Sequence, residues 1–490
     1  MVEAFAANAD RGNQPDDTRL ARAVAPQVAR HPQHSGIHPL EDGLDAFASR
    51  YLLISMAERT LDIQYYIWQN DMSGRLLFSA LLEAAERGVR VRLLLDDNNT
   101  NGLDETLIEL NRHAYIQIRL FNPFSFRTLR ALGYLTDFAR LNRRMHNKSF
   151  TADGMATIVG GRNIGDEYFG TGDEPLFSDL DVLALGPVVE EVSADFERYW
   201  HSGAVSALNS VVQSDNDDPL SAVQLPTAWR DNPQVQQYLQ RLHASSFIAR
   251  LESGELELIW ANTRLLSDDP RKGLGKAKAS TLLPQRMLEV IGKPQQQFDI
   301  ISAYFVPTRA GVAQLLALKR NGVNIAIFTN SLAANDVSVV HAGYAKWRKK
   351  LLRHGIALYE LKPQSDNRDV THDRGLTGNS GSSLHAKTFS VDNQKVFIGS
   401  FNFDPRSAVL NTEMGLVIES ETLAISVHQR FVSRMRDKAW KLRLDKWGRV
   451  NWVEYEGEAG EQVHKHEPRT RFMQRLLVRL VWRLPVEWLL

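Results

Sequence analysis

The chain has 490 residues, with 58 basic and 58 acidic side chains, so its formal net charge is zero. Its 43% hydrophobic and 24% charged content is that of an ordinary soluble protein, and a chain of this length suggests two to four domain-sized units. It has no cysteine, which excludes disulfides, thiol nucleophiles and cysteine-ligated zinc. The zero net charge gives no global attraction to nucleic acid or to anionic lipid, so any such attraction must be local.

The N-terminal segment is polar, basic and contains proline, and we expect residues 1–36 to be flexible. It lacks the basic start and apolar run of a signal peptide. No stretch of the chain approaches ~18 consecutive apolar residues. We therefore expect no helix that spans a bilayer.

An alternation of helices and strands follows this segment. Apolar residues at helical spacing between Leu44 and Met56 predict a helix, and a strand is expected near Leu61–Trp68. Residues 74–88 predict a second helix that ends at Gly88, and residues 89–97 predict a buried strand. The order indicates an α/β fold.

The same order returns later in the chain. Residues 298–307, 310–322 and 323–330 repeat the strand, helix and strand of the first half. The chain therefore looks like an internal duplication with a period near 240 residues. We expect a first repeat at 37–202, an inter-repeat linker region at 203–255, a second repeat at 256–450 and a C-terminal tail at 451–490.

Polar residues recur at identical intervals in the two halves. The first half carries His146, Lys148, Asp153, Gly160, Gly161 and Asn163, and the second carries His385, Lys387, Asp392, Gly399, Ser400 and Asn402. The offsets from each histidine are 0, 2, 7, 14, 15 and 17 residues in both sets. A lone HxK carries almost no information, whereas this pair of six-point matches is very specific.

Each set has a readable local geometry. Alternate side chains of a strand share a face, so each histidine and its lysine should point the same way, roughly 6.5–7 Å apart along the strand. Asp153-Gly154 predicts a tight turn, and the second copy turns at Asp392-Asn393-Gln394. The returning strand ends in small residues, which allow close approach of a ligand, and brings the asparagine back near the histidine.

Two imidazoles, two ammonium groups and two amides suit an anionic phosphoryl group. The lysines neutralise its non-bridging oxygens, and the asparagines donate hydrogen bonds to them. One histidine can attack phosphorus, and the other can act as general acid and then as general base. Each motif supplies half a site, and no metal or other cofactor is required because the lysines carry the positive charge.

The pattern HxKxxxxD followed by GGxN or GSxN resembles the signature of the phospholipase D superfamily. Longer stretches, such as "RLNRRMHNKSFTADGMATIVGGRNIGDEYFG" and "LHAKTFSVDNQKVFIGSFNFDPRSAVLNTEMGLVIES", resemble its bacterial cardiolipin synthases, over nearly the whole chain from about residue 36. The resemblance implies two α/β repeats with mixed sheets flanked by helices. They would be related by a pseudo-twofold axis, with the active site at their interface.

The resemblance also implies roles for the residues. The expected catalytic set is His146, Lys148, Asp153, His385, Lys387 and Asp392, and the expected substrate-binding set is Asn163, Asn402, Gly160, Gly161, Gly399 and Ser400. The family often has a carboxylate that orients each imidazole, and alignment of "SDLDVLALG" with "NTEMGLVIE" suggests Asp181 and Glu413. By analogy His146 is the nucleophile and His385 the acid/base, with the reverse left open. A structural role for Asp153 and Asp392, at the hairpin turns, also stays open.

The implied reaction moves a phosphatidyl group from a donor phospholipid to phosphatidylglycerol, giving cardiolipin through a phosphatidyl-histidine intermediate. The resemblance alone implies phosphatidylethanolamine as donor. It also implies a peripheral protein on the cytoplasmic side of the bacterial inner membrane, and no nucleic-acid partner is expected. The residues themselves do not indicate an oligomeric state.

The C-terminal stretch "RTRFMQRLLVRLVWRLPVEWLL" offers a membrane contact. Arg471, Arg475, Arg479 and Arg483 recur every four residues, and apolar residues fill the other side, with Trp482 and Trp488 nearby. This pattern is typical of an interfacial helix. A helix packed on the protein body with solvated arginines is the alternative. Residues 120–144, which interleave aromatic and basic residues, are a second candidate contact.

Two other classes of function remain open at this stage. A hydrolase or nuclease of the same superfamily could use the same paired centre, although nucleic-acid binders are usually basic and this chain is neutral. A non-catalytic membrane scaffold is the other alternative, and two intact motifs argue against it.

Overall fold

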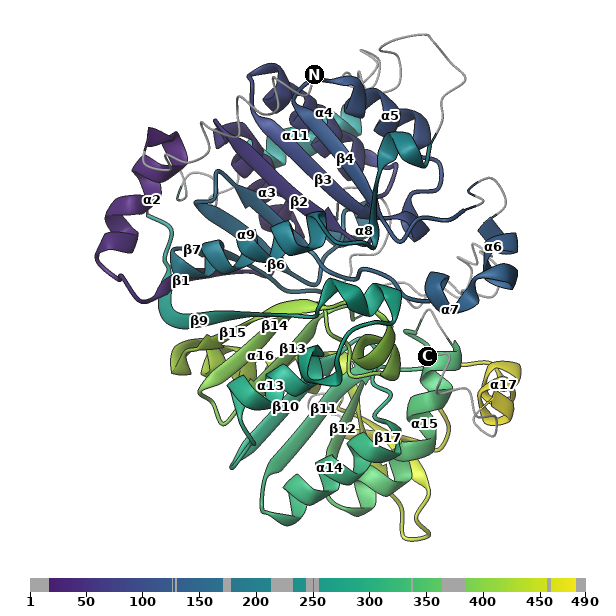
Figure 1. Ribbon diagram of the computed structural model, residues 1–490. Coiled ribbons are helices and arrows are strands. Elements are labelled where there is room, and N and C mark those ends of the chain that lie inside the picture. The colour runs from purple at the N-terminus through teal and green to yellow at the C-terminus, as the bar shows by residue number, and fades with distance from the viewer. Residues whose placement is uncertain are drawn as a thin grey trace. The chain divides into compact units, whose positions relative to one another are not determined.

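The computed structural model describes residues 17–125, 127, 130–170, 178–212, 232–243, 250, 255–335, 338–363, 384–455 and 460–481 (Figure 1). The described chain forms two compact units. The first contains the residues up to 170, 180–283 and 410–416. The second contains residues 178–179, 284–409 and those from 417 onward. Each unit therefore contains a short segment of the other repeat. Residues 178–179 of the first repeat belong to the second unit, and residues 410–416 of the second repeat belong to the first unit.

The first unit is built on a mixed sheet in the order β8-β4-β3-β2-β5-β6-β7-β1-β9. Its strands are β1 (Ser35–Leu40), β2 (Thr60–Tyr65), β3 (Arg90–Asp96), β4 (Ile116–Phe121), β5 (Ser149–Ala152), β6 (Ala156–Gly160), β7 (Asp181–Leu185), β8 (Val205–Ala207) and β9 (Ile259–Ser267). Strands β2, β3 and β4 are parallel, and the other neighbours are antiparallel. The parallel strands are almost wholly buried and rich in Leu, Ile and Val, as expected for a sheet covered on both faces.

Helices cover both faces of this sheet. They are α2 (Arg19–Ala29), α3 (Gly43–Met56), α4 (Met72–Glu86), α5 (Asp104–Arg112), α6 (Arg130–Thr136), α7 (Phe138–Leu141), α8 (Asp166–Phe169), α9 (Pro187–Trp200) and α11 (Pro233–His243), with short 3-10 turns at Asp97–Asn99, Leu208–Ser210, Pro270–Leu274 and Ala279–Thr281. Arg92 forms ion pairs with Asp62 of β2 and with Glu197 of α9. On the other side, Arg50 of α3 donates a hydrogen bond to the hydroxyl of Tyr65 of β2. Because alternate strand residues point to opposite faces, α9 and α3 cover different sides.

The second unit repeats this plan in the order β14-β13-β10-β11-β12-β16-β17-β18 (Figure 1). Its strands are β10 (Gln297–Ser302), β11 (Asn324–Asn330), β12 (Ala357–Leu361), β13 (Lys387–Val391), β14 (Lys395–Gly399), β16 (Ala439–Leu444), β17 (Val450–Tyr455) and β18 (Glu461–His464). Its helices are α13 (Leu283–Ile291), α14 (Thr308–Arg320), α15 (Ser338–Arg353), α16 (Glu421–Lys438) and α17 (Phe472–Val481), with a π turn at Arg406–Leu410. Strand β15 (Met414–Glu419) runs from the first unit into the second.

The elements expected from the sequence are present, with shifted ends. The strands expected at 61–68 and 298–307 end earlier, at Tyr65 and Ser302. The N-terminal segment expected to be flexible contains α2, which Thr18 caps by accepting from the Ala21 N–H, and the start of β1. Residues 1–16 of that segment lie outside the described residues.

The expected repeat boundaries do not coincide with the compact units. Strand β9, which was expected in the second repeat, belongs to the first unit because it pairs with β1. The expected linker region 203–255 contains β8 and α11, while 213–231, 244–249 and 251–254 lie outside the described residues. No helix among the described residues is both long enough and apolar enough to cross a membrane.

Candidate active site

The first histidine is held by its backbone between two fixed points of the first unit. The Met145 N–H donates to the carboxylate of Asp96, at the end of β3, at 2.7 Å. The His146 N–H donates to the Thr412 carbonyl at 2.9 Å. Asp96 is fully buried and also pairs with the buried guanidinium of Arg144 at 3.1 Å. His146 therefore lies just before β5, rather than within a strand, and its backbone is fixed from both sides.

The His146 imidazole contacts a buried carboxylate. Nδ1 lies 2.8 Å from Oε2 of Glu413, whose side chain is fully buried. An ionised carboxylate only accepts hydrogen bonds, so this contact assigns the Nδ1 proton and presents Nε2 for chemistry. The ring of Tyr66 stands edge-on to the imidazole at 4.9 Å between centroids. The imidazole is thus oriented by a hydrogen bond and by packing.

Lys148 brings a buried positive charge to the same place. Only 1% of the residue is exposed, and its Nζ donates to the His146 carbonyl at 2.6 Å. The ammonium group also lies 5.5 Å from the centre of the Tyr66 ring. A buried ammonium group beside the imidazole is suited to bind a phosphate oxygen.

The second unit builds the same arrangement around His385. Nδ1 of His385 is hydrogen-bonded to Asp179, whose side chain is fully buried. The His385 N–H donates to the Ser178 carbonyl at 2.9 Å, and Lys387 Nζ donates to the His385 carbonyl. Asn330, at the end of β11, exchanges two hydrogen bonds of 2.9 Å with the backbone of Leu384. Each histidine is therefore held through the residue that precedes it.

These positions correspond one to one in the two units. Asp96 and Asn330 end equivalent strands and bind the residue before each histidine. Met145 bridges Thr412, and Leu384 bridges Ser178. The residue that follows Thr412 is Glu413, and the residue that follows Ser178 is Asp179. Each unit therefore takes its carboxylate from the other repeat. A hydroxyl residue followed by an acid, Ser178-Asp179 and Thr412-Glu413, is the sequence signal that identifies both.

Asp181 was expected to orient a histidine, and the structure places it elsewhere. Its carboxylate pairs with Arg50 at 2.8 Å and with Arg162 at 3.5 Å, and all three side chains are buried. Asp181 is the first residue of β7, so it lies within the sheet, whereas Asp179 precedes the strand and contacts His385. The expectation picked the wrong acid of the pair, two residues away.

Asp153 and Asp392 were expected in the catalytic set, and both lie in hairpin turns instead. Asp153 accepts from the backbone N–H groups of Glu58, Arg59 and Thr60, at the start of β2. Asp392 accepts from residues 295–297, at the start of β10. Both residues have positive φ, 51° and 54°. They join the hairpin to the neighbouring strand, which is a structural role.

The expected substrate-binding residues fall into two groups. The amide of Asn163 accepts from the Ile67 N–H at 3.3 Å and donates to the Tyr168 hydroxyl at 2.9 Å, so it is largely used within the first unit. Asn402 is 5% exposed, and its Oδ1 has no hydrogen-bond partner among the described residues. Its Oδ1 can accept a hydrogen bond from a donor of a ligand, whereas a phosphate oxygen could be bound only through its amide nitrogen.

The small residues also serve the fold. A Cβ atom at Gly160 would lie 2.1 Å from Oδ1 of Asp181, so glycine is required there by a carboxylate of the protein rather than by a ligand. The Gly161 N–H donates to the Leu180 carbonyl at 3.2 Å. Gly399 ends β14, and Ser400, which follows it, is fully buried.

A second buried acid supports Glu413. Asp268 accepts from the Glu413 N–H at 3.0 Å and pairs with Lys272 at 2.8 Å. Burial raises the pKa of Asp268 to about 6, against the opposing effect of Lys272, and the nearby charge of Glu413 raises it further. The carboxylate that orients His146 is therefore held by a group that itself titrates near neutral pH.

Helix α17 presents an apolar surface. Val478 is buried against Leu332 and Ala342, so one side of the helix packs on its own unit. The large apolar residues on the rest of the helix are 37–67% exposed: Phe472, Met473, Leu476, Leu477 and Leu480. The expected Trp482, Arg483 and Trp488 lie outside the described residues. In the second candidate contact, Phe121 and Phe124 are core residues, while Leu135 and Phe138 are exposed.

Comparison with known proteins places this geometry in a family. A family model described as cardiolipin synthase, phospholipase D-like domain, matches residues 52–200 and 287–435. Cardiolipin synthase C of Escherichia coli (strain K12) is 64% identical over 472 residues, covering 96% of this chain and 100% of that protein. An uncharacterized protein of Helicobacter pylori (strain ATCC 700392 / 26695) is 33% identical over 474 residues, covering 94% and 91%.

A solved structure shares the fold. The crystal structure of phosphatidylserine synthase from Haemophilus influenzae Rd KW20 aligns with 96% of this chain and 100% of its own, with a TM-score of 0.59 and 14% identity. This likeness and the two matched stretches confirm the expected fold class, two phospholipase D-like repeats with mixed sheets and helices.

Proposed function

The chain belongs to the cardiolipin synthase family of phospholipase D-like phosphatidyltransferases, and from this premise we propose how its residues carry out the transfer. The observation that carries the proposal is the same contact in both units: the Nδ1 atom of a motif histidine against a buried carboxylate. Two imidazoles with the same fixed tautomer provide a nucleophile and an acid/base of matched geometry.

In the first step Nε2 of His146 attacks the phosphorus of the donor phospholipid. A P–N bond forms and the P–O bond to the headgroup breaks. His385, which begins this step as the imidazolium, gives its Nε2 proton to the leaving alcohol. In the second step His385 takes the proton from a primary hydroxyl of phosphatidylglycerol as that oxygen attacks phosphorus and the P–N bond breaks. The products are cardiolipin and the free headgroup alcohol, and both imidazoles return to their starting protonation states.

Glu413 and Asp179 act as positioning residues in this scheme. Each holds its imidazole with Nε2 toward the phosphoryl group and stabilises the cation that forms when that nitrogen bonds phosphorus or binds a proton. Lys148 and Lys387, which are 1% and 2% exposed, neutralise the non-bridging oxygens. Asn402 donates to one of these oxygens through its amide nitrogen.

We assign phosphatidylethanolamine as the donor, so that the released alcohol is ethanolamine. The protein would work as a peripheral protein on the cytoplasmic side of the bacterial inner membrane, where both phospholipids are available. The exposed apolar residues of α17 support a membrane contact, because an unpaired apolar helix face flanked by arginines favours an anionic lipid surface.

The test is to incubate the purified full-length chain with phosphatidylglycerol vesicles, with and without phosphatidylethanolamine, and to follow the products by mass spectrometry. We expect cardiolipin and ethanolamine to rise together only when phosphatidylethanolamine is present. If cardiolipin forms and glycerol is released instead of ethanolamine, the donor is a second molecule of phosphatidylglycerol. Phosphatidic acid as the main product would make the protein a hydrolase, and no cardiolipin in either mixture would refute the proposal.

A further inference from the structure

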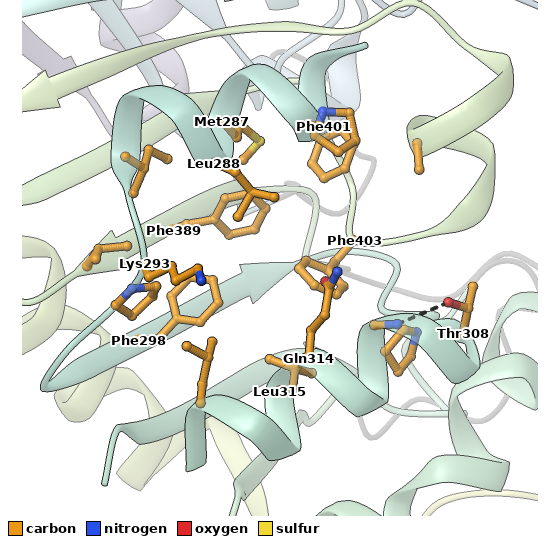
Figure 2. A pocket seen from close by; sticks show the side chains of 18 of the residues that line it. Met287, Leu288, Lys293, Phe298, Thr308, Gln314, Leu315, Phe389, Phe401 and Phe403 are labelled. Carbon is orange, nitrogen blue, oxygen red and sulfur yellow. Dashed lines mark hydrogen bonds between the residues drawn. The ribbon is translucent and has the colours of Figure 1, made fainter. Parts of the chain in front are cut away.

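The second unit contains a cavity of about 620 Å³ between α13 and α14 (Figure 2). Met287 and Leu288 line it from α13, and Gln314 and Leu315 line it from α14. Phe298 of β10 and Phe389 of β13 also line it, together with Phe401 and Phe403. Its volume falls within the roughly 300–1,000 Å³ of typical ligand pockets.

The lining is almost entirely aliphatic and aromatic. Lys293 and Asp404 are its only charged residues. Its uncharged polar side chains are Gln285 of α13, Thr308 and Gln314 of α14, and Asn321, which follows α14. A lining dominated by apolar side chains offers burial to a hydrocarbon.

The matching helices of the first unit lie in direct contact. Helices α3 and α4 flank β2 in sequence as α13 and α14 flank β10, and α3 packs directly against α4. Helix α13 has 9 residues, whereas α3 has 14. The shorter α13 therefore distinguishes the second unit at the place where the cavity lies.

The cavity and the second half-site share strand β13. Lys387, Phe389 and Val391 alternate along β13 and so share one face of the sheet. Phe389 and Val391 line the cavity, about 6.6 Å and 13 Å along the strand from the lysine. Phe401 and Phe403 also line it, and they flank Asn402. These spacings are within the length of a phospholipid acyl chain whose phosphate lies at Lys387.

We propose that this cavity binds one acyl chain of a phospholipid substrate whose phosphate lies at His385 and Lys387. The inference rests on the proposed function for the identity of the lipid. The cavity would select the lipid by chain length, because each methylene moved out of water contributes about fourfold to affinity until the space is filled.

Photocrosslinking of the full-length protein tests the proposal without turnover. The probe is phosphatidylglycerol with a diazirine near the end of one acyl chain, presented in detergent micelles, and the labelled peptides are mapped by mass spectrometry. We expect labels on residues 284–294 and 308–321. A phenylalanine at Gly311 should fill the cavity, since a Cβ atom there meets Phe403 at an ordinary 3.6 Å. Gly311→Phe should lower this labelling at least tenfold.

Ala313→Phe is the matched control, because Ala313 is exposed on the same helix and does not line the cavity. It should label as the unmodified chain does. Leu288→Trp fills the cavity from α13 and replaces Gly311→Phe if that variant does not fold. Labels outside both segments, or labelling equal in Gly311→Phe and Ala313→Phe, would overturn the proposal.

A kinetic measurement separates this inference from the proposed function. Monomeric phosphatidylglycerols with butanoyl and octanoyl chains are compared as acceptors. The unmodified chain should favour the octanoyl lipid at least tenfold in kcat/KM. Gly311→Phe should lose that preference, whereas Ala313→Phe should keep it. Turnover without chain-length preference would overturn the acyl site alone, whereas crosslinking at the cavity without any cardiolipin would count against the proposed function alone.

Discussion

Glu413 lies 2.8 Å from Nδ1 of His146, although 267 residues separate them in the sequence. The carboxylate reaches the histidine because residues 410–416 of the second repeat belong to the first compact unit. Asp179 makes the reciprocal contact to His385 in the second unit. Each histidine therefore needs a carboxylate from the other repeat, so one repeat alone cannot form a complete half-site.

Glu413→Gln should lower kcat by about 10²–10⁴-fold and leave KM within a few-fold, because the amide can hold the ring but does not stabilise the imidazolium. Steady-state kinetics with phosphatidylglycerol and phosphatidylethanolamine measure this. Glu413→Asp should recover part of the rate. A purely structural Glu413 would instead give a lower melting temperature and a normal kcat per folded molecule.

Asp179 and Asp181 provide a matched pair two residues apart. Asp179→Asn should lower kcat by about 10²-fold or more with little change in stability, since Asp179 orients His385. Asp181→Asn should instead destabilise the fold by about 3–5 kcal/mol, because it leaves the buried Arg50 without its counter-charge. Denaturant unfolding and kcat per folded molecule distinguish the two. The opposite pattern would restore Asp181 as the orienting residue.

This pair also shows how far the sequence predicts the site. The repeated spacing predicted both histidines and both lysines, because strand and turn geometry is local and was duplicated intact, whereas Glu413 came from the family resemblance and the alignment of "SDLDVLALG" with "NTEMGLVIE". The spacing did not predict Asp96 and Asn330, which end strands 49 and 54 residues before the backbone groups that they bind. Such contacts depend on which strands become neighbours, and spacing within a motif carries no information about that.

For Asp153 and Asp392 the sequence left both a catalytic and a structural role open, for a related reason. Their conserved offset in the two halves reflects the hairpin itself, whose turn residues bind the start of the adjacent strand. A duplicated structural contact and a duplicated catalytic residue leave the same pattern in one sequence. The fold class, in contrast, was predictable because helix and strand periodicities alternate over long stretches.

The apolar face of α17 should mediate membrane binding. The double variant Phe472→Ser and Leu480→Ser removes two exposed apolar side chains without touching Val478, which anchors the helix. We expect vesicle partitioning to fall at least tenfold, since each side chain contributes about 1.5–3 kcal/mol when fully buried. Val432→Ser, at another exposed apolar position, is the control. Sedimentation with anionic vesicles measures the effect, and unchanged partitioning of the double variant would rule out α17 as the contact.

Glu167 should make stability depend on pH. Burial raises its pKa to about 7, and the charge of Asp71 adds to the effect. The folded state therefore binds this proton more tightly than the unfolded chain, so the contribution of Glu167 to stability is greatest below about pH 4 and is lost as the pH rises through 7. Between pH 5 and 8 the unmodified chain should lose about 2 kcal/mol more of its free energy of unfolding than Glu167→Gln does. Urea unfolding at the two pH values measures the difference, and parallel profiles for both proteins would contradict it.

The central claim is that His146 carries the phosphatidyl group. The most direct measurement is mass spectrometry of the intact protein, denatured at alkaline pH after mixing with phosphatidylglycerol and phosphatidylethanolamine, because a P–N bond to histidine is labile in acid. In His385→Ala the first step lacks its acid and the second lacks its base, so a phosphatidyl adduct should form slowly, persist and map to His146, whereas His146→Ala should form none. An adduct on His385 in the His146→Ala variant would reverse the two roles and contradict the account.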